Sequence, residues 1–101
     1  MQVTLQTTGD AAVISPGGRF DFKAHHDFKR CTEAALRNTV VRKIEINMDA
    51  VEYLDSSALG MLLLLREQAQ DRGMDVALRN CRGAVKEILD IANFGTIFPI
   101  H

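Results

Sequence analysis

The stretch LDSSALGMLLLL, residues 54–65, places one carboxylate and two hydroxyls directly before a long apolar run. Asp55, Ser56 and Ser57 all favour the position before a helix, because a side-chain oxygen there accepts a hydrogen bond from an amide left unpaired in the first turn. One such residue is enough to cap a helix. We therefore expect Asp55 or Ser56 to cap a helix over residues 57–72, which ends at Gly73, and the remaining hydroxyl to be solvated.

Strand and helix periods alternate along the rest of the chain. Three segments alternate between apolar and polar residues, as half-buried strands do, and they span residues 2–7, 43–48 and 75–79. Residues 11–15 form a further short strand. Gly9 and Asp10 separate this strand from the first segment, and a connection of two residues predicts a hairpin. The pattern therefore predicts an antiparallel pair at the start of the chain, followed by two single strands.

Two further segments have the 3.6-residue period of an amphipathic helix. One begins at Asp21, the expected N-cap, and the other covers residues 84–92. Residues 96–100 are expected to be extended. The phenylalanines are expected to pack in or around the core, and they are Phe20, Phe22, Phe28 and Phe94.

The order of elements predicts the fold class. Strand-helix-strand units at this spacing indicate parallel neighbours joined by right-handed crossovers. Because the strands alternate, one face of the sheet should be exposed to water, which argues against a Rossmann or flavodoxin arrangement. We expect an α/β fold with a mixed, mostly parallel sheet of four to five strands, an N-terminal antiparallel pair, and about three helices packed on one face.

Composition and motifs exclude several classes of function. The 101 residues suit a single domain, and a formal charge of −1 gives no field that would attract nucleic acid. No apolar stretch approaches the ~20 residues that span a bilayer, so we expect a cytoplasmic protein without membrane insertion. Cys31 and Cys81 have no CxxC spacing, and His25 and His26 are adjacent, so neither pair predicts a metal site. LDSSALG lacks the GxSxG form of a nucleophile elbow. We therefore expect that the protein is not an enzyme and that it binds no cofactor.

Three stretches carry a resemblance to a known family. INMDAVEYLDSSALGMLLLL, residues 46–65, resembles the signature of the STAS domain, the fold of the anti-sigma factor antagonists, in which Asp-Ser-Ser-Gly-Leu-Gly leads into a helix. GGRFDF, residues 17–22, resembles the family's Gly-x-Leu-Asp segment, and residues 74–94 resemble its strand-helix half. The resemblance covers essentially the whole chain and implies one STAS domain over residues 1–101.

The resemblance also implies site residues. The first serine after the aspartate is phosphorylated in this family, which corresponds to Ser56, with Asp55 and Ser57 at flanking positions. Asp21 corresponds to an acidic residue near that serine. This chain departs from the family pattern in two places. Ala58 replaces the usual glycine, and alanine favours helix more than glycine does. The chain ends at His101, so the C-terminal helix of longer members is expected to be missing or vestigial.

The function that the resemblance implies is partner switching. An unphosphorylated antagonist of this family binds an anti-sigma factor, often a serine protein kinase with a GHKL-type ATPase fold, and so releases the sigma factor. Phosphorylation of the serine abolishes the complex, and a PP2C-type serine phosphatase restores it. The domain is then a substrate and not a catalyst. Several short members serve motility or biofilm switches.

Two physical points accompany this interpretation. A helix start tolerates the ~1.5 to 2 negative charges of a phosphate, because free amides and the positive end of the dipole face it. The leucines after Gly60 exceed the ~100° stripe that packing requires, so either neighbouring helices bury the surplus or an apolar docking patch lies beside Ser56. The expected partner-binding residues are Asp21, Asp55, Ser57, Ala58, Leu59, Gly60, Met61 and Leu63.

Two rival functions remain open at this point. A STAS-like subunit of a transport or signalling complex would use the same surface without any phosphate cycle. A small nucleotide-binding or hydrolytic protein is the other.

Overall fold

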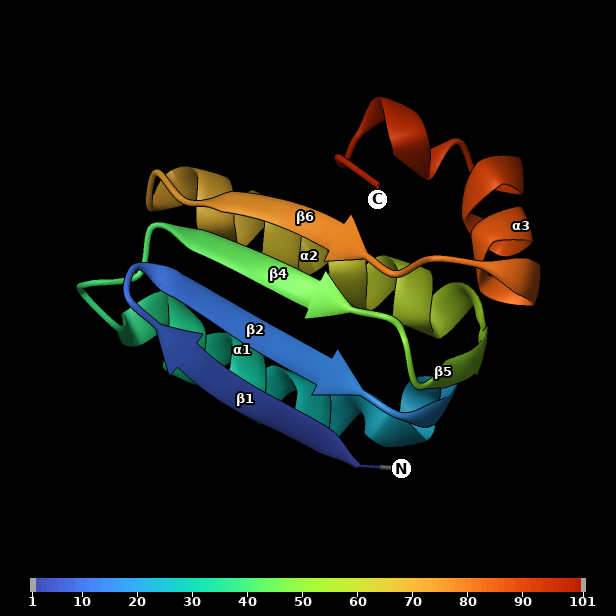
Figure 1. Cartoon of the computed structure of the whole chain (residues 1–101), viewed down its shortest axis with the longest axis horizontal. Helices are drawn as coiled ribbons and strands as arrows, with labels where there is room; N and C mark the ends of the chain where they lie inside the picture. Colours follow the sequence, from blue (N-terminus) through green and yellow to red (C-terminus); the bar gives the residue numbers. More distant parts are fainter. Residues whose placement is uncertain (1, 101) are drawn as a thin grey trace.

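The predicted hairpin opens the structure. In the computed structural model, which describes residues 2–100, β1 (Val3–Thr8) and β2 (Ala11–Pro16) pair antiparallel around Gly9, whose φ of 59° suits a tight turn. Two more strands, β4 (Lys43–Asn47) and β6 (Asp75–Arg79), extend the sheet in parallel. The strand order is β1-β2-β4-β6 (Figure 1), so the predicted mixed sheet is confirmed.

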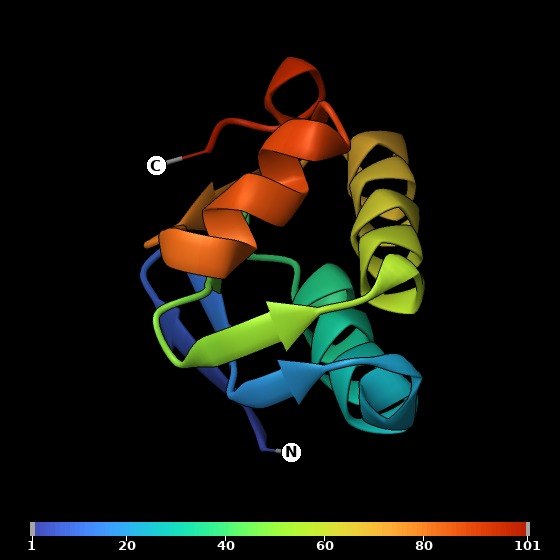
Figure 2. The same ribbon diagram turned by 90° about the vertical axis from the view of Figure 1, so that its right-hand side faces the viewer.

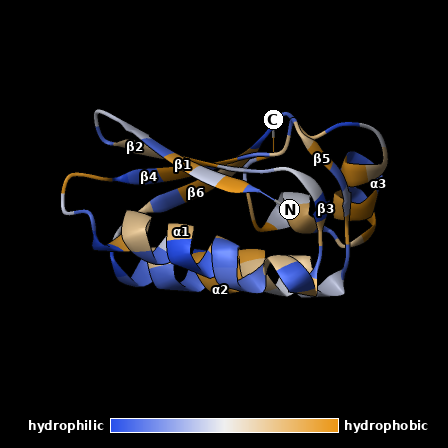
Figure 3. Ribbon diagram, turned by 90° about the horizontal axis from the view of Figure 1, so that it is seen from below, coloured by the Kyte–Doolittle hydropathy of each residue, from blue (hydrophilic) through white to orange (hydrophobic). Residues whose placement is uncertain are grey.

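Helices α1 (His25–Arg37) and α2 (Ser56–Asp71) cover one face of this sheet (Figure 3). Alternate strand residues are buried on that side, among them Ile14, Ile44 and Leu78. The opposite face is polar, as the alternation predicts; there Glu45 and Arg79 form an ion pair of 2.9 Å. The third helix, α3 (Gly83–Ile91), lies at one end of the sheet, where it packs against β5 (Val51–Leu54).

A second, two-stranded sheet is the element that the periodicity missed. Strand β3 (Gly18–Phe20) pairs in parallel with β5, and Figure 2 shows the two short arrows side by side. The periodicity predicts no strand at either place, because strands of three and four residues are too short to show an alternation. Phe20 and Leu54 are both buried, and the Arg19 guanidinium stacks over the Tyr53 ring at 4.7 Å.

The end of the described chain is only partly extended. Asn93 adopts a left-handed conformation with φ of 58°, and a short 3₁₀ helix, η2 (Phe94–Thr96), follows it. The predicted extended segment is therefore wrong at Thr96, and pairing appears only as a bridge between Ile100 and Leu78. His101, on which the expectation about the chain end rests, lies outside the described residues. No helix within residues 2–100 is long and apolar enough to cross a membrane.

Candidate functional site

The start of α2 is built around Asp55. Its backbone is extended, with φ of −107° and ψ of −177°, and its Oδ1 accepts a hydrogen bond of 2.9 Å from the Ala58 amide. Leu59 N donates to the Asp55 carbonyl at 3.1 Å. Asp55 is therefore the cap, one of the two alternatives that the sequence allowed, and the helix begins at Ser56. Ser56 and Ser57 are both exposed.

The β3–β5 pair brings a second carboxylate to this helix start. Phe20 is aligned with Leu54, and Asp55 N donates to the Phe20 carbonyl at 3.3 Å. Because parallel strands end at the same edge of a sheet, Asp21 and Asp55 follow side by side. Asp21 caps the 3₁₀ helix η1 (Phe22–Ala24) by accepting a bond of 3.0 Å from Lys23 N. The prediction that Asp21 caps the amphipathic helix is therefore wrong: Asp21 caps the 3₁₀ turn that precedes α1, and the N-cap of α1 is Ala24.

The two sides of α2 differ in burial. Four residues at helical spacing are buried against the core, namely Ala58, Leu62, Leu65 and Ala69. Ser56, Gly60 and Leu63 lie at i, i+4 and i+7 on an exposed side, and we call these three residues the α2 stripe. Leu63 is 38% exposed and Leu64 is 52% exposed. Leu59 and Met61 are partly buried. Neighbouring elements thus bury only some of the surplus leucines, and Leu63 and Leu64 stay exposed about two turns along α2 from Ser56.

An open groove adjoins the helix start on the side of α1. Its volume is about 550 Å³, and it is lined by Phe22, Lys23, His25, His26, Ser57 and Met61. Phe22 is 65% exposed, which contradicts its expected packing role. The exposure follows from the Asp21 cap, which fixes Phe22 at the first position of η1, outside the apolar face of α1 that carries Phe28.

Gly60 lies in the middle of the exposed side without a packing reason in this chain. A Cβ built on it would meet nothing within 4 Å, and its φ is not positive, so the backbone does not require glycine. Glycine inside a helix costs ~0.5 to 1 kcal/mol relative to alanine. The fold would therefore be more stable with alanine at this position.

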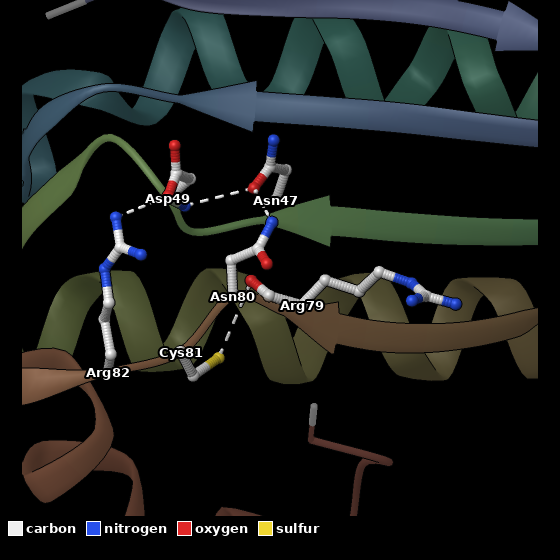
Figure 4. Close-up of polar contacts among 6 residues, drawn as sticks. All are labelled: Asn47, Asp49, Arg79, Asn80, Cys81 and Arg82. Atoms are coloured by element: carbon white, nitrogen blue, oxygen red, sulfur yellow. Dashed lines mark hydrogen bonds and ion pairs between the residues drawn. The ribbon is translucent and has the colours of Figure 1, made fainter.

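A polar network joins the loops that follow β4 and β6 (Figure 4). Asn47 Oδ1 accepts bonds from Asn80 Nδ2 at 2.8 Å and from Asp49 N at 3.1 Å, and the Arg82 guanidinium pairs with Asp49. The first of these loops leads directly into β5 and hence to Asp55. The network therefore helps to fix the start of α2 relative to the main sheet.

The histidines and cysteines show no metal or redox arrangement within residues 2–100. No group of three or more His, Cys, Asp or Glu side chains there could hold a metal ion. Both thiols are free, and burial raises the pKa of Cys31 and of Cys81, so they stay protonated near neutral pH.

Comparison with known proteins agrees with this architecture. The profile of the STAS domain matches residues 2–101. The chain belongs to the STAS domain family. The STAS-domain containing protein PA14_20770 of Pseudomonas aeruginosa is 42% identical over 92 residues, which are 91% of this chain and 89% of that protein. The anti-sigma-F factor antagonist RsfA of Mycobacterium tuberculosis is 26% identical over 102 residues, which are 100% of this chain and 80% of RsfA.

Solved structures of the anti-sigma factor antagonist SpoIIAA share the fold. Its unphosphorylated form aligns with a TM-score of 0.78 at 20% identity and covers 99% of this chain and 87% of SpoIIAA. The phosphorylated form from Bacillus aligns with a TM-score of 0.75 at 19% identity, and the alignment covers 99% of this chain and 91% of SpoIIAA. At this level of identity the likeness establishes the fold alone.

Proposed function

We propose that this STAS domain is an anti-sigma factor antagonist whose binding to its partner is abolished by phosphorylation of Ser56. The observation that carries the proposal is the exposed Ser56 hydroxyl at the first position of α2, in line with Gly60 and Leu63. A relative with the name anti-sigma-F factor antagonist supports the class of function.

The helix start suits a phosphoryl group. The first turn of a helix has up to four amides without helical partners, and Asp55 uses only the one at Ala58. The remaining amides and the positive end of the helix dipole favour the ~1.5 to 2 added charges. The fold therefore keeps its stability when Ser56 is modified, while the neighbouring carboxylates Asp55 and Asp21 add to the repulsion that a partner meets.

The surface beside Ser56 suits a protein partner. Exposed apolar side chains lie on the same side of the domain: Leu63 and Leu64 about two turns farther along α2, and Phe22 in the groove that Ser57 and Met61 also line. Gly60 leaves room for a partner backbone to approach α2 closely, which gives a reason for a residue that weakens the helix. The partner that this proposal names is an anti-sigma factor or serine protein kinase of the GHKL type, and a PP2C-type phosphatase would restore binding.

The direct test is phosphorylation by a GHKL-type serine kinase from the organism that encodes this protein. The purified domain is incubated with that kinase and Mg-ATP, and intact mass is followed for wild type, Ser56→Ala and the matched control Ser57→Ala. We expect one phosphoryl group on wild type and on Ser57→Ala, and none on Ser56→Ala. Calorimetric titration should show that the phosphorylated form no longer binds the partner.

Two outcomes would overturn the switch. A phosphoryl group that persists in Ser56→Ala would place the modification elsewhere. Stable partner binding without phosphorylation under any condition would favour an interaction subunit that has no phosphate cycle.

A further inference from the structure

The two edges of the main sheet differ in how they are covered. At the β6 edge, Leu78 N donates to the Pro99 carbonyl at 2.9 Å, and the strand carries Asp75 and Arg79 at its ends. At the other edge, β1 has the sequence VTLQTT, with neither a charged residue nor a proline, and no other strand of residues 2–100 pairs with its outer side. Exposed strand edges normally carry charges, prolines or a cover that blocks pairing.

The hairpin register shows which backbone groups of β1 point outward. Thr8 and Ala11 close a two-residue turn and exchange hydrogen bonds, so every second residue from Thr8 backward bonds to β2. Gly17 N donates to Gln2 O at 2.9 Å, which fits this phase, and Pro16, which has no N–H, lies opposite a residue that does not bond inward. The outward N–H and C=O groups therefore belong to Val3, Leu5 and Thr7.

We propose that β1 pairs antiparallel with β1 of a second copy of this chain and so joins two four-stranded sheets into one. A two-fold axis at Leu5 aligns Leu5 with its own equivalent and Val3 with Thr7 of the other copy. Each of these three residues then donates one bond and accepts one. A second copy fits this edge because a strand without charged residues presents no like charges to itself, and the net charge of −1 adds little repulsion.

Side chains at the same edge support the pairing. Val3 and Leu5 are only partly buried, and each would gain cover from the other copy. Helix α1 runs beside β1 in the same direction (Figure 1), with Cys31 Sγ 3.8 Å from Val3 O. Leu5 lies two residues, or ~6.6 Å, farther along the strand, which corresponds to about four helical residues. Four residues after Cys31 is Ala35, which is buried, and the adjacent Ala34 is exposed at the same level of α1; its small side chain lets the two helices approach.

The size of the contact limits the affinity. Pairing two six-residue strands with a small helix contact buries less than the ~1,200 Å² typical of stable interfaces. We therefore expect a dimer that dissociates in the range of ~10 to 100 µM.

Amide hydrogen exchange tests the pairing without any substitution. Exchange is followed by NMR at protein concentrations from about 10 µM to about 1 mM, alongside sedimentation velocity. The amides of Thr4, Gln6 and Thr8 should be protected at every concentration, because they bond to β2. The amides of Leu5 and Thr7 should become protected only as the dimer forms.

Two substitutions separate this edge from other contacts. Thr7→Pro removes an outward N–H at an exposed position, and the matched control Thr7→Val keeps it; we expect dimerisation to weaken at least tenfold in the first variant and to persist in the second. Ala34→Arg should weaken it as well, with circular dichroism and thermal melting confirming that each variant is folded. Ser56→Asp should dimerise like wild type, so failure here is distinct from failure of the phosphorylation switch.

Either of two results would overturn the proposal. One is a monomer throughout this concentration range. The other is a dimer that Thr7→Pro leaves unchanged while the Leu5 and Thr7 amides stay exposed to exchange.

Discussion

The two sides of α2 use the same residue types for different ends. On the inner side, Leu62 and Leu65 are essentially inaccessible to solvent and form part of the core. On the outer side, Leu63 and Leu64 have the same chemistry but remain 38% and 52% exposed. Burial, and not residue type, therefore decides which leucine holds the fold together and which is available to a partner.

The largest expected effect tests this contrast with neighbouring leucines. Leu62→Ala should lower the free energy of unfolding by ~2 to 5 kcal/mol, because it removes buried methyl groups and leaves a cavity. Leu63→Ala should change it by less than ~0.5 kcal/mol, since alanine suits a helix and the site is exposed. Urea denaturation of both variants gives the comparison. Equal losses would show that Leu63 is covered in solution.

The start of α2 depends on a hydrogen bond to its cap. Asp55→Ala should cost ~0.5 to 2 kcal/mol, because the Ala58 amide loses the acceptor that now lies 2.9 Å away. Ser57→Ala, a change at an exposed position of the same turn, serves as the control and should cost less. Thermal melting of the two variants measures the difference. If both lose the same stability, the hydrogen bond to Ala58 is not what starts the helix.

A substitution on the α2 stripe should separate stability from binding. Gly60→Ala should raise the free energy of unfolding by ~0.5 to 1 kcal/mol, because the added methyl group meets open space and alanine favours helix. The same methyl group should weaken binding to the anti-sigma factor if that protein approaches α2 closely. Denaturation and calorimetric titration provide the two readouts. Unchanged binding would remove Gly60 from the contact surface.

The fold could be predicted from the sequence where a segment is long enough to show a clear hydrophobic period. Strands such as residues 43–48 and 75–79 alternate clearly, and the structure places them at Lys43–Asn47 and Asp75–Arg79. Strands β3 and β5 could not be found in this way, because three or four residues are stabilised by pairing with each other and not by a pattern of their own.

The candidate site was predictable in its parts but not in its assembly. A cap, two hydroxyls and surplus leucines can be recognised in residues 54–65, and the structure confirms Asp55 as the cap. The approach of Asp21 to the same helix start depends on the β3–β5 pair, which only the structure reveals. The exposure of Phe22 depends on the capped 3₁₀ turn that sets it apart from the α1 face.

The smallest effect on stability is expected at Ser56 itself, where the effect on binding should be large. Ser56→Asp adds a negative charge at the first position of α2, which the helix dipole favours, while the adjacent Asp55 opposes it by a similar amount. The two contributions nearly cancel, so the free energy of unfolding should change by less than ~0.5 kcal/mol. Affinity for the anti-sigma factor should fall at least tenfold, whereas Ser56→Ala should bind like wild type. A loss of several kcal/mol in Ser56→Asp would mean that the side chain is enclosed in solution and cannot accept a phosphoryl group while the domain stays folded.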